Sequence, residues 1–126
     1  MIDKLIHFEV GDKKYPLAFN LNVIEMIQEE YEDLNEWQEY LSPSDDKLPN
    51  IKVLKQTFTW FINEGIDIEN DDLEVKRPFL THKQVGRLLS QLGTDNALKN
   101  IFETVSSGLV EDEDTDPNTK SQAIQE

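Results

Sequence analysis

The sequence predicts an α+β fold that is mainly α, with an N-terminal β-hairpin packed on a small bundle of about four to five helices. Three observations predict it. Apolar residues alternate on both sides of a Gly11-Asp12 turn, the following segments carry apolar stripes of helical period, and the composition turns polar after Val110. We therefore expect a single globular domain over residues 1–109 and a disordered acidic tail over 110–126.

The hairpin is expected on either side of that turn. The first strand is rich in β-formers, namely Leu5, Ile6, Phe8 and Val10. The second shows period-two alternation at Tyr15, Leu17 and Phe19. Pro16 has no N–H to donate, so we expect its strand to lie on an edge.

The first helix is predicted to start at Asn22, a good N-cap, with Glu25 at the third helical position reaching back to it. Leu21 and Met26 occupy the positions of a hydrophobic staple. The apolar stripe behind this cap consists of Val23, Ile24, Ile27 and Tyr31. Two strands bury too little surface to be stable alone, so this helix must cover the hairpin.

One or two further helical turns are expected over residues 36–41, after a break at residues 33–35. Apolar residues stand there at i, i+3 and i+4: Trp37, Tyr40 and Leu41. Residues 42–50 read as a loop, because they are rich in Pro, Ser, Asp and Asn.

A helix over residues 51–64 follows, capped by Asn50. Its stripe consists of Ile51, Leu54, Phe58, Phe61 and Ile62. Gly65 stands where a left-handed residue ends many helices, and Ile66 with Phe61 would form the accompanying hydrophobic pair. Val53 and Trp60 lie opposite the stripe. Either this helix is central and buried on two sides, or Trp60 is an exposed aromatic that meets a partner.

Residues 67–78 form a polar connection. Thr81 then caps a helix over 82–92 with Gln84 closing a capping box, and Gly93 ends it. A helix over 96–107, ended by Gly108, completes an αα-hairpin with it. The stripes of these two helices are Val85, Leu88, Leu89 and Leu92, and then Leu98, Ile101, Phe102 and Val105.

Composition excludes several classes of function. The formal net charge is −14, from 26 acidic and 12 basic residues, so the nucleic-acid backbone and anionic membranes repel the chain. The sequence has no cysteine and no apolar run of the ~18 residues that a membrane span needs, and residues 1–10 lack the apolar segment of a signal peptide, so we expect none there. We expect a cytoplasmic protein whose partners are proteins, either basic ones or ones that normally bind DNA; self-association stays open.

No pattern typical of an enzyme or a cofactor site is present. Two acidic runs begin like a calcium-binding loop, but Asp72 and Pro117 stand where the first and the second run need glycine. The two histidines, His7 and His82, are far apart in sequence. We therefore expect no catalytic residue, no cofactor and no metal, and the acidic residues are best read as solvated.

The order of segments resembles that of a known family. A hairpin "FEVGDKKYPLAF" leads through "NLNVIEMIQEEYEDLNEW" into "IKVLKQTFTWFINEGIDIEN" and then "FLTHKQVGRLLSQLG". Over residues 5 to 105 this is similar to the tail assembly chaperones encoded by phages and prophages of low-GC Gram-positive bacteria.

The resemblance implies a protein that binds the tape measure protein, a very long helical protein, before the tail tube forms around it. Such chaperones catalyse nothing, act in the host cytoplasm and are absent from the finished virion. Many exist in a short form and a frameshifted long form, and an acidic tail suits the end of a short form.

A chaperone of this kind needs an apolar groove on its surface. The candidate partner-binding residues are the apolar positions least easily assigned to the core: Trp37, Tyr40, Val53 and Trp60. Two alternatives remain. The charge of −14 and the size of the chain suit an acidic inhibitor that imitates DNA, and the other alternative is a structural tail component.

Overall fold

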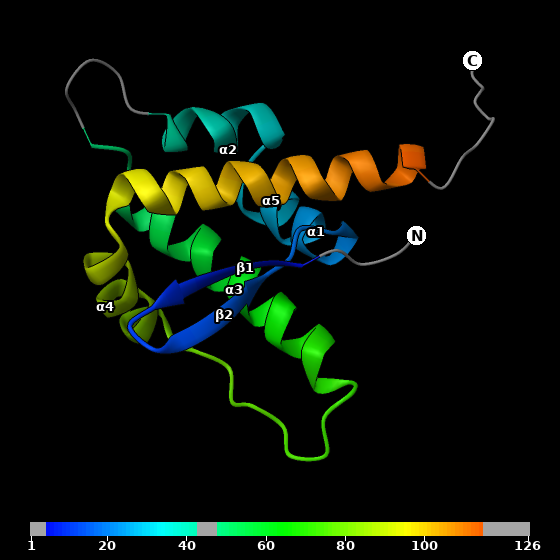
Figure 1. Cartoon of the computed structure of the whole chain (residues 1–126). Helices are drawn as coiled ribbons and strands as arrows, with labels where there is room; N and C mark the ends of the chain where they lie inside the picture. Colours follow the sequence, from blue (N-terminus) through cyan, green and yellow to red (C-terminus); the bar gives the residue numbers. More distant parts are fainter. Residues whose placement is uncertain (1–4, 43–47, 115–126) are drawn as a thin grey trace.

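A computed structural model describes residues 5–42 and 48–114, and of residues 110–114 only the helical backbone. Two strands, β1 (Ile6–Val10) and β2 (Lys13–Leu17), form an antiparallel hairpin. The described helices are α1 (Leu21–Glu30), α2 (Leu34–Leu41), α3 (Ile51–Asn70), α4 (His82–Leu92) and α5 (Thr94–Asp114). The predicted fold class, a hairpin packed on a small helical bundle, is confirmed (Figure 1).

Helix α3 is the centre of the fold. It packs against β2 and against all four other helices, and Figure 1 shows it passing behind the hairpin. Its buried residues include Val53 as well as most of the predicted stripe, so the helix is buried on two sides. The largest fully buried side chains come from α2 and α3: Trp37, Phe58 and Phe61. The Trp37 indole N–H donates to Thr57 Oγ1 at 2.8 Å, which satisfies its one polar atom inside the core.

The prediction that Gly65 ends the third helix is wrong, because α3 continues to Asn70. Gly65 instead allows the end of β2 to lie against the helix. A Cβ at this position would stand 2.8 Å from the backbone of Pro16, closer than packed atoms allow. The approach lets the Ala18 N–H donate to the Phe61 carbonyl at 3.1 Å. Close packing, and not a left-handed turn, is therefore the reason for glycine here.

Gly108 makes the same kind of contact from the other side. A Cβ on it would stand 2.4 Å from the Phe19 carbonyl oxygen, so α5 also lies directly on the segment that follows β2. The prediction that Gly108 ends a helix is wrong, and α5 begins at Thr94 and runs to Asp114. The boundary predicted for the tail at residue 110 thus falls within a helix, and residues 115–126 lie outside the described part.

The hairpin accommodates Pro16 because a two-stranded sheet leaves each strand one unpaired edge. Pro16 is paired with His7 in the register and is buried against α3. Phe8, on the same hairpin, meets Phe58 edge-on with ring centroids 5.3 Å apart. The expectation that the Pro16 strand is an edge strand is confirmed.

The N-cap of α1 differs from the prediction. Asn20, not Asn22, caps the helix, and its side-chain oxygen accepts from the N–H of Asn22 at 3.1 Å and of Val23 at 3.3 Å. Phe19 is buried against Trp37 and Phe61. The helix begins directly after this buried residue, which puts Asn20 at the N-cap position. Leu21 is 69% exposed and does not form a staple.

The caps of the later helices follow the sequence more closely. Asn50 accepts from the Val53 N–H at 3.1 Å, as predicted. The Thr81 hydroxyl accepts from the Gln84 N–H at 3.1 Å while the Gln84 side chain accepts from the Thr81 N–H at 2.8 Å, which confirms the capping box of α4. Gly93 then ends α4 with a φ of 93°.

Candidate functional site

An apolar groove of about 290 Å³ lies between α1, α3 and the connector that joins α3 to α4 (residues 71–81). Its lining consists of Met26, Trp60, Asn63, Glu64, Asp67 and Phe79. We call it the acid-rimmed groove, because the charged residues that line it, within the part of the chain that the structure describes, are the carboxylates Glu64 and Asp67.

Three side chains give the groove its apolar surface. Trp60 comes from the face of α3 that points away from the main core stripe, and it is half-buried. Met26 contributes from α1 and is also half-buried. Phe79 stands on the connector and is 55% exposed, so its ring is largely uncovered. Exposed aromatic surface beside a hollow is typical of a protein-binding site.

The connector wall is held in place by paired hydrogen bonds from α3. The Asn63 side chain donates to the Leu80 carbonyl at 3.0 Å and accepts from the Leu80 N–H at 2.9 Å. Two turns further along α3, the Asn70 side chain donates to the Arg77 carbonyl at 3.0 Å and accepts from the Arg77 N–H at 2.9 Å. These two asparagines fix the connector on either side of Phe79, so the third wall of the groove is preformed.

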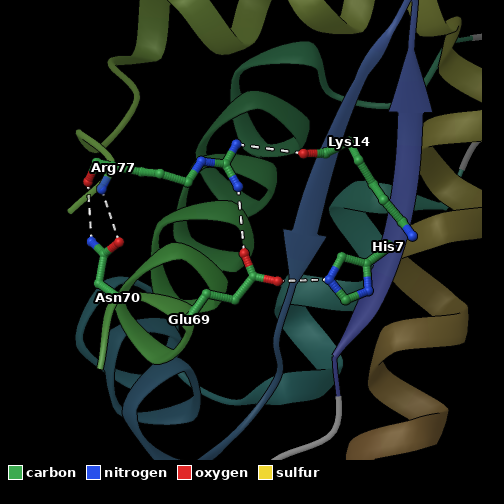
Figure 2. Close-up of polar contacts among 5 residues, drawn as sticks. All are labelled: His7, Lys14, Glu69, Asn70 and Arg77. Carbon is green, nitrogen blue, oxygen red and sulfur yellow. Dashed lines mark hydrogen bonds and ion pairs between the residues drawn. The ribbon is translucent and has the colours of Figure 1, made fainter. Parts of the chain in front are cut away.

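The far end of the connector is also tied to the hairpin. Glu69 accepts from the Arg77 guanidinium at 3.4 Å and lies 2.8 Å from His7 Nε2, as Figure 2 shows. The guanidinium also donates to the Lys14 carbonyl at 3.4 Å and lies over the Tyr15 ring at 5.8 Å. Lys76 donates to the carbonyl of Asn70, the last residue of α3, where a cation is favoured, and to the carbonyl of Leu73 in the connector.

The acidic rim is partly fixed by α1. One carboxylate oxygen of Glu64 accepts from the side-chain amides of Asn20 at 2.8 Å and Asn22 at 3.0 Å. Asp67 is exposed one turn further along α3. An apolar floor with a negative rim is complementary to apolar side chains flanked by Lys or Arg.

Only one of the four predicted partner-binding residues lines this groove. Trp60 does. Trp37 and Val53 are 1% and 6% exposed, so both lie in the core and neither is a surface residue. Tyr40 is 44% exposed, but it stands on α2, where its ring lies 5.8 Å from that of Tyr31.

Burial raises the pKa of Tyr31, whose hydroxyl donates to Gln56 at 2.7 Å, and the charge of Glu30 raises this pKa further.

Sequence reasoning missed the two other apolar residues of the groove, Phe79 and Met26. Phe79 is a lone aromatic at the end of a polar connection, which in retrospect is the signal that could have identified it. Met26 was explained as half of a staple that the structure does not contain. Nothing in the sequence indicates that these two side chains meet beside Trp60.

The described residues contain no group of three His, Asp or Glu side chains arranged to hold a metal ion. The run of Asp67 and Glu69, which resembled the start of a calcium loop, belongs to α3 and not to a loop. A search of the same residues finds no helix long and apolar enough to cross a membrane.

Comparisons with protein-family models, curated proteins and solved structures return no match to this chain.

Proposed function

We propose that this protein is a phage tail assembly chaperone that binds the tape measure protein and keeps it soluble during tail assembly. The proposal rests on the sequence resemblance and is supported by one structural observation, the preformed acid-rimmed groove with Trp60 beside the exposed Phe79. In this proposal the protein acts in the host cytoplasm, has no catalytic activity and leaves before the virion is complete.

The groove suits a long amphipathic helix. Such a helix presents apolar residues every three or four positions, and each of them contributes about 1.5–3 kcal/mol when fully buried. Trp60 is half-buried in the free protein and would be covered by the partner, so it is the expected hot spot. The carboxylates of Glu64 and Asp67 would select a helix segment with flanking Lys or Arg.

The test is co-expression with the long helical protein encoded nearest downstream. We expect the partner to become soluble, to co-purify and to remain bound in moderate salt. Trp60→Ala should weaken the complex by roughly 30-fold, the effect of losing about 2 kcal/mol. Phe102→Ala is the matched control, since Phe102 is a 44% exposed aromatic on α5 that does not line the groove. Equal binding by the two variants, both folded, would contradict the proposal.

The acidic DNA mimic keeps one observation in its favour. Seven acidic residues stand on or between α1 and α2 from Glu25 to Glu39, and no Lys or Arg occurs between Lys14 and Lys47. A mimic would bind a DNA-binding host protein in a strongly salt-dependent way, whereas a helical partner in an apolar groove would tolerate salt. Stable incorporation into purified particles would instead indicate a structural tail component.

A further inference from the structure

A second groove, of about 410 Å³, lies between the first turns of α3 and helix α4. Its floor is aliphatic, formed by the buried Leu54 and Leu89 and by Ile51, which is 42% exposed. Its rim carries Lys55, Lys83 and Arg87. A smaller hollow of about 280 Å³ adjoins it and is lined by Ile51, Lys52, Lys55 and His82. We call these two together the cation-rimmed groove.

The charge of this groove is opposite to that of the protein. The chain carries −14, yet no Asp or Glu of the described residues lines either hollow, and four of the 12 Lys and Arg residues do. The helix N-termini add to the positive potential, because α3 begins at Ile51 and α4 begins at His82. Among the described residues the ion pairs join Glu69 to His7 and to Arg77, so none of these four cations is paired there.

The position of one cation, Lys55, depends on the space that Gly86 leaves on α4. A Cβ at Gly86 would stand 3.1 Å from Lys55 Cε and 3.3 Å from Lys55 Nζ, so the lysine side chain lies across α4 where that helix has no side chain. Glycine in a helix interior lowers the stability of the helix, relative to alanine, by about the free energy of a weak hydrogen bond. Here it places an ammonium group beside the aliphatic floor.

We infer that the cation-rimmed groove is a docking site for an acidic amphipathic helix of a partner protein. The aliphatic floor takes apolar side chains of that helix, and the rim pairs with its Asp and Glu residues. A small anion would leave the floor uncovered. Nucleic acid is repelled by the rest of the surface, and a second copy of the chain brings another −14. This inference does not rest on the proposed function.

The test uses the full chain and a synthetic amphipathic helix of about 15 residues, with leucines on one face and glutamates beside them, labelled for fluorescence anisotropy. A matched peptide has lysines in place of the glutamates. We expect the acidic peptide to bind and the basic peptide not to bind at this groove. The double variant Lys83→Glu with Arg87→Glu should bind the acidic peptide roughly tenfold more weakly. Lys13→Glu with Lys99→Glu makes the same change of net charge away from the groove and should leave the affinity unchanged.

Gly86→Ala separates binding from folding. The added methyl group improves the helix and displaces only the flexible end of Lys55, so the variant should melt no lower than the parent chain yet bind the acidic peptide more weakly. Equal loss of affinity for the acidic peptide in both double variants, or a loss of affinity for the basic peptide in Lys83→Glu with Arg87→Glu, would overturn the inference. Self-association of the chain through Lys83 and Arg87 in the absence of peptide would also overturn it.

Discussion

The acid-rimmed and cation-rimmed grooves lie on the same helix but share almost no chemistry. The cation-rimmed groove uses Leu54 and Lys55, near the start of α3, and the acid-rimmed groove uses Trp60 and Asp67, further along the same helix. At 100° per residue, the two pairs point to faces of α3 about 180° apart. One groove has an aromatic floor and carboxylates, and the other has an aliphatic floor and cations. In our proposals, apolar surface makes both places binding sites, and the charge of the rim decides which partner each accepts.

The walls of the two grooves also differ. Both walls of the cation-rimmed groove are helices, α3 and α4. The acid-rimmed groove has an irregular wall, the connector, whose position depends on Asn63 and Asn70. A change to those anchors should therefore affect one groove far more than the other.

Gly65→Ala should have the largest effect, because it moves α3 relative to the hairpin and disturbs both grooves together. The added Cβ would meet the Pro16 backbone, so we expect the free energy of unfolding to fall by about 3 kcal/mol. Urea denaturation measures it. Gly11→Ala is the control: it meets no atom within 4 Å, has a φ of 65°, and should cost only about 1 kcal/mol. A smaller loss for Gly65→Ala than for Gly11→Ala would contradict the close-approach reading.

Asn63→Ala should separate the grooves. It removes both hydrogen bonds to Leu80 and leaves a backbone amide without its partner, at a cost of about 1–3 kcal/mol. We expect faster hydrogen exchange over the connector and weaker binding at the acid-rimmed groove, with the acidic peptide bound as before. Unchanged exchange at residues 71–80 would show that the connector is fixed by other contacts.

Neutralising either rim should have a smaller, selective effect. Glu64→Gln with Asp67→Asn should weaken a basic amphipathic peptide two- to fivefold and spare the acidic one, because exposed ion pairs contribute about 0.2–1 kcal/mol each. Lys83→Gln with Arg87→Gln should do the reverse. Anisotropy titrations at low and high salt measure both, and the difference should shrink as salt rises. Identical responses of the two peptides would remove the distinction between the grooves.

The smallest effect is expected outside both grooves, at Tyr31. Its pKa is raised above the ordinary 10.0 by burial, so the neutral phenol stabilises the fold below that pH, and the stabilisation is lost as pH rises through the raised value. Tyr31→Phe should therefore flatten the alkaline limb of a pH–stability curve. Between pH 5 and 8 it should lower the free energy of unfolding by a constant amount, because the hydrogen bond to Gln56 is lost at every pH. Peptide binding at either groove should be unaffected.

Most of the fold could be predicted from local sequence patterns. The hairpin alternation, the Asn50 cap and the Thr81 capping box depend on neighbours in sequence, and each is found where it was predicted. Gly65 and Gly108 were misread because a glycine at a helix end and a glycine under another backbone look alike in sequence. Only the packed hairpin shows which role applies.

The candidate site was harder to predict than the fold, because it depends on contacts between elements that are distant in sequence. Trp60 was identified from its position opposite the core stripe, which is a property of one helix. Trp37 and Val53 both lie in the core that several elements build together, where Trp37 packs against Phe19 and Phe61, and no single helix reveals this. Phe79 joins the groove through Asn63, a contact that spans 17 positions to Leu80.

The two tryptophans allow the most direct test that the partner occupies the acid-rimmed groove. Trp37 is buried and bonded to Thr57, and Trp60 lines the groove, so each indole N–H gives one NMR signal from a known place. On adding the co-purified helical partner to the ¹⁵N-labelled chain, we predict that the Trp60 signal shifts and the Trp37 signal stays. A saturating partner that leaves the Trp60 signal in place would contradict the proposed binding site.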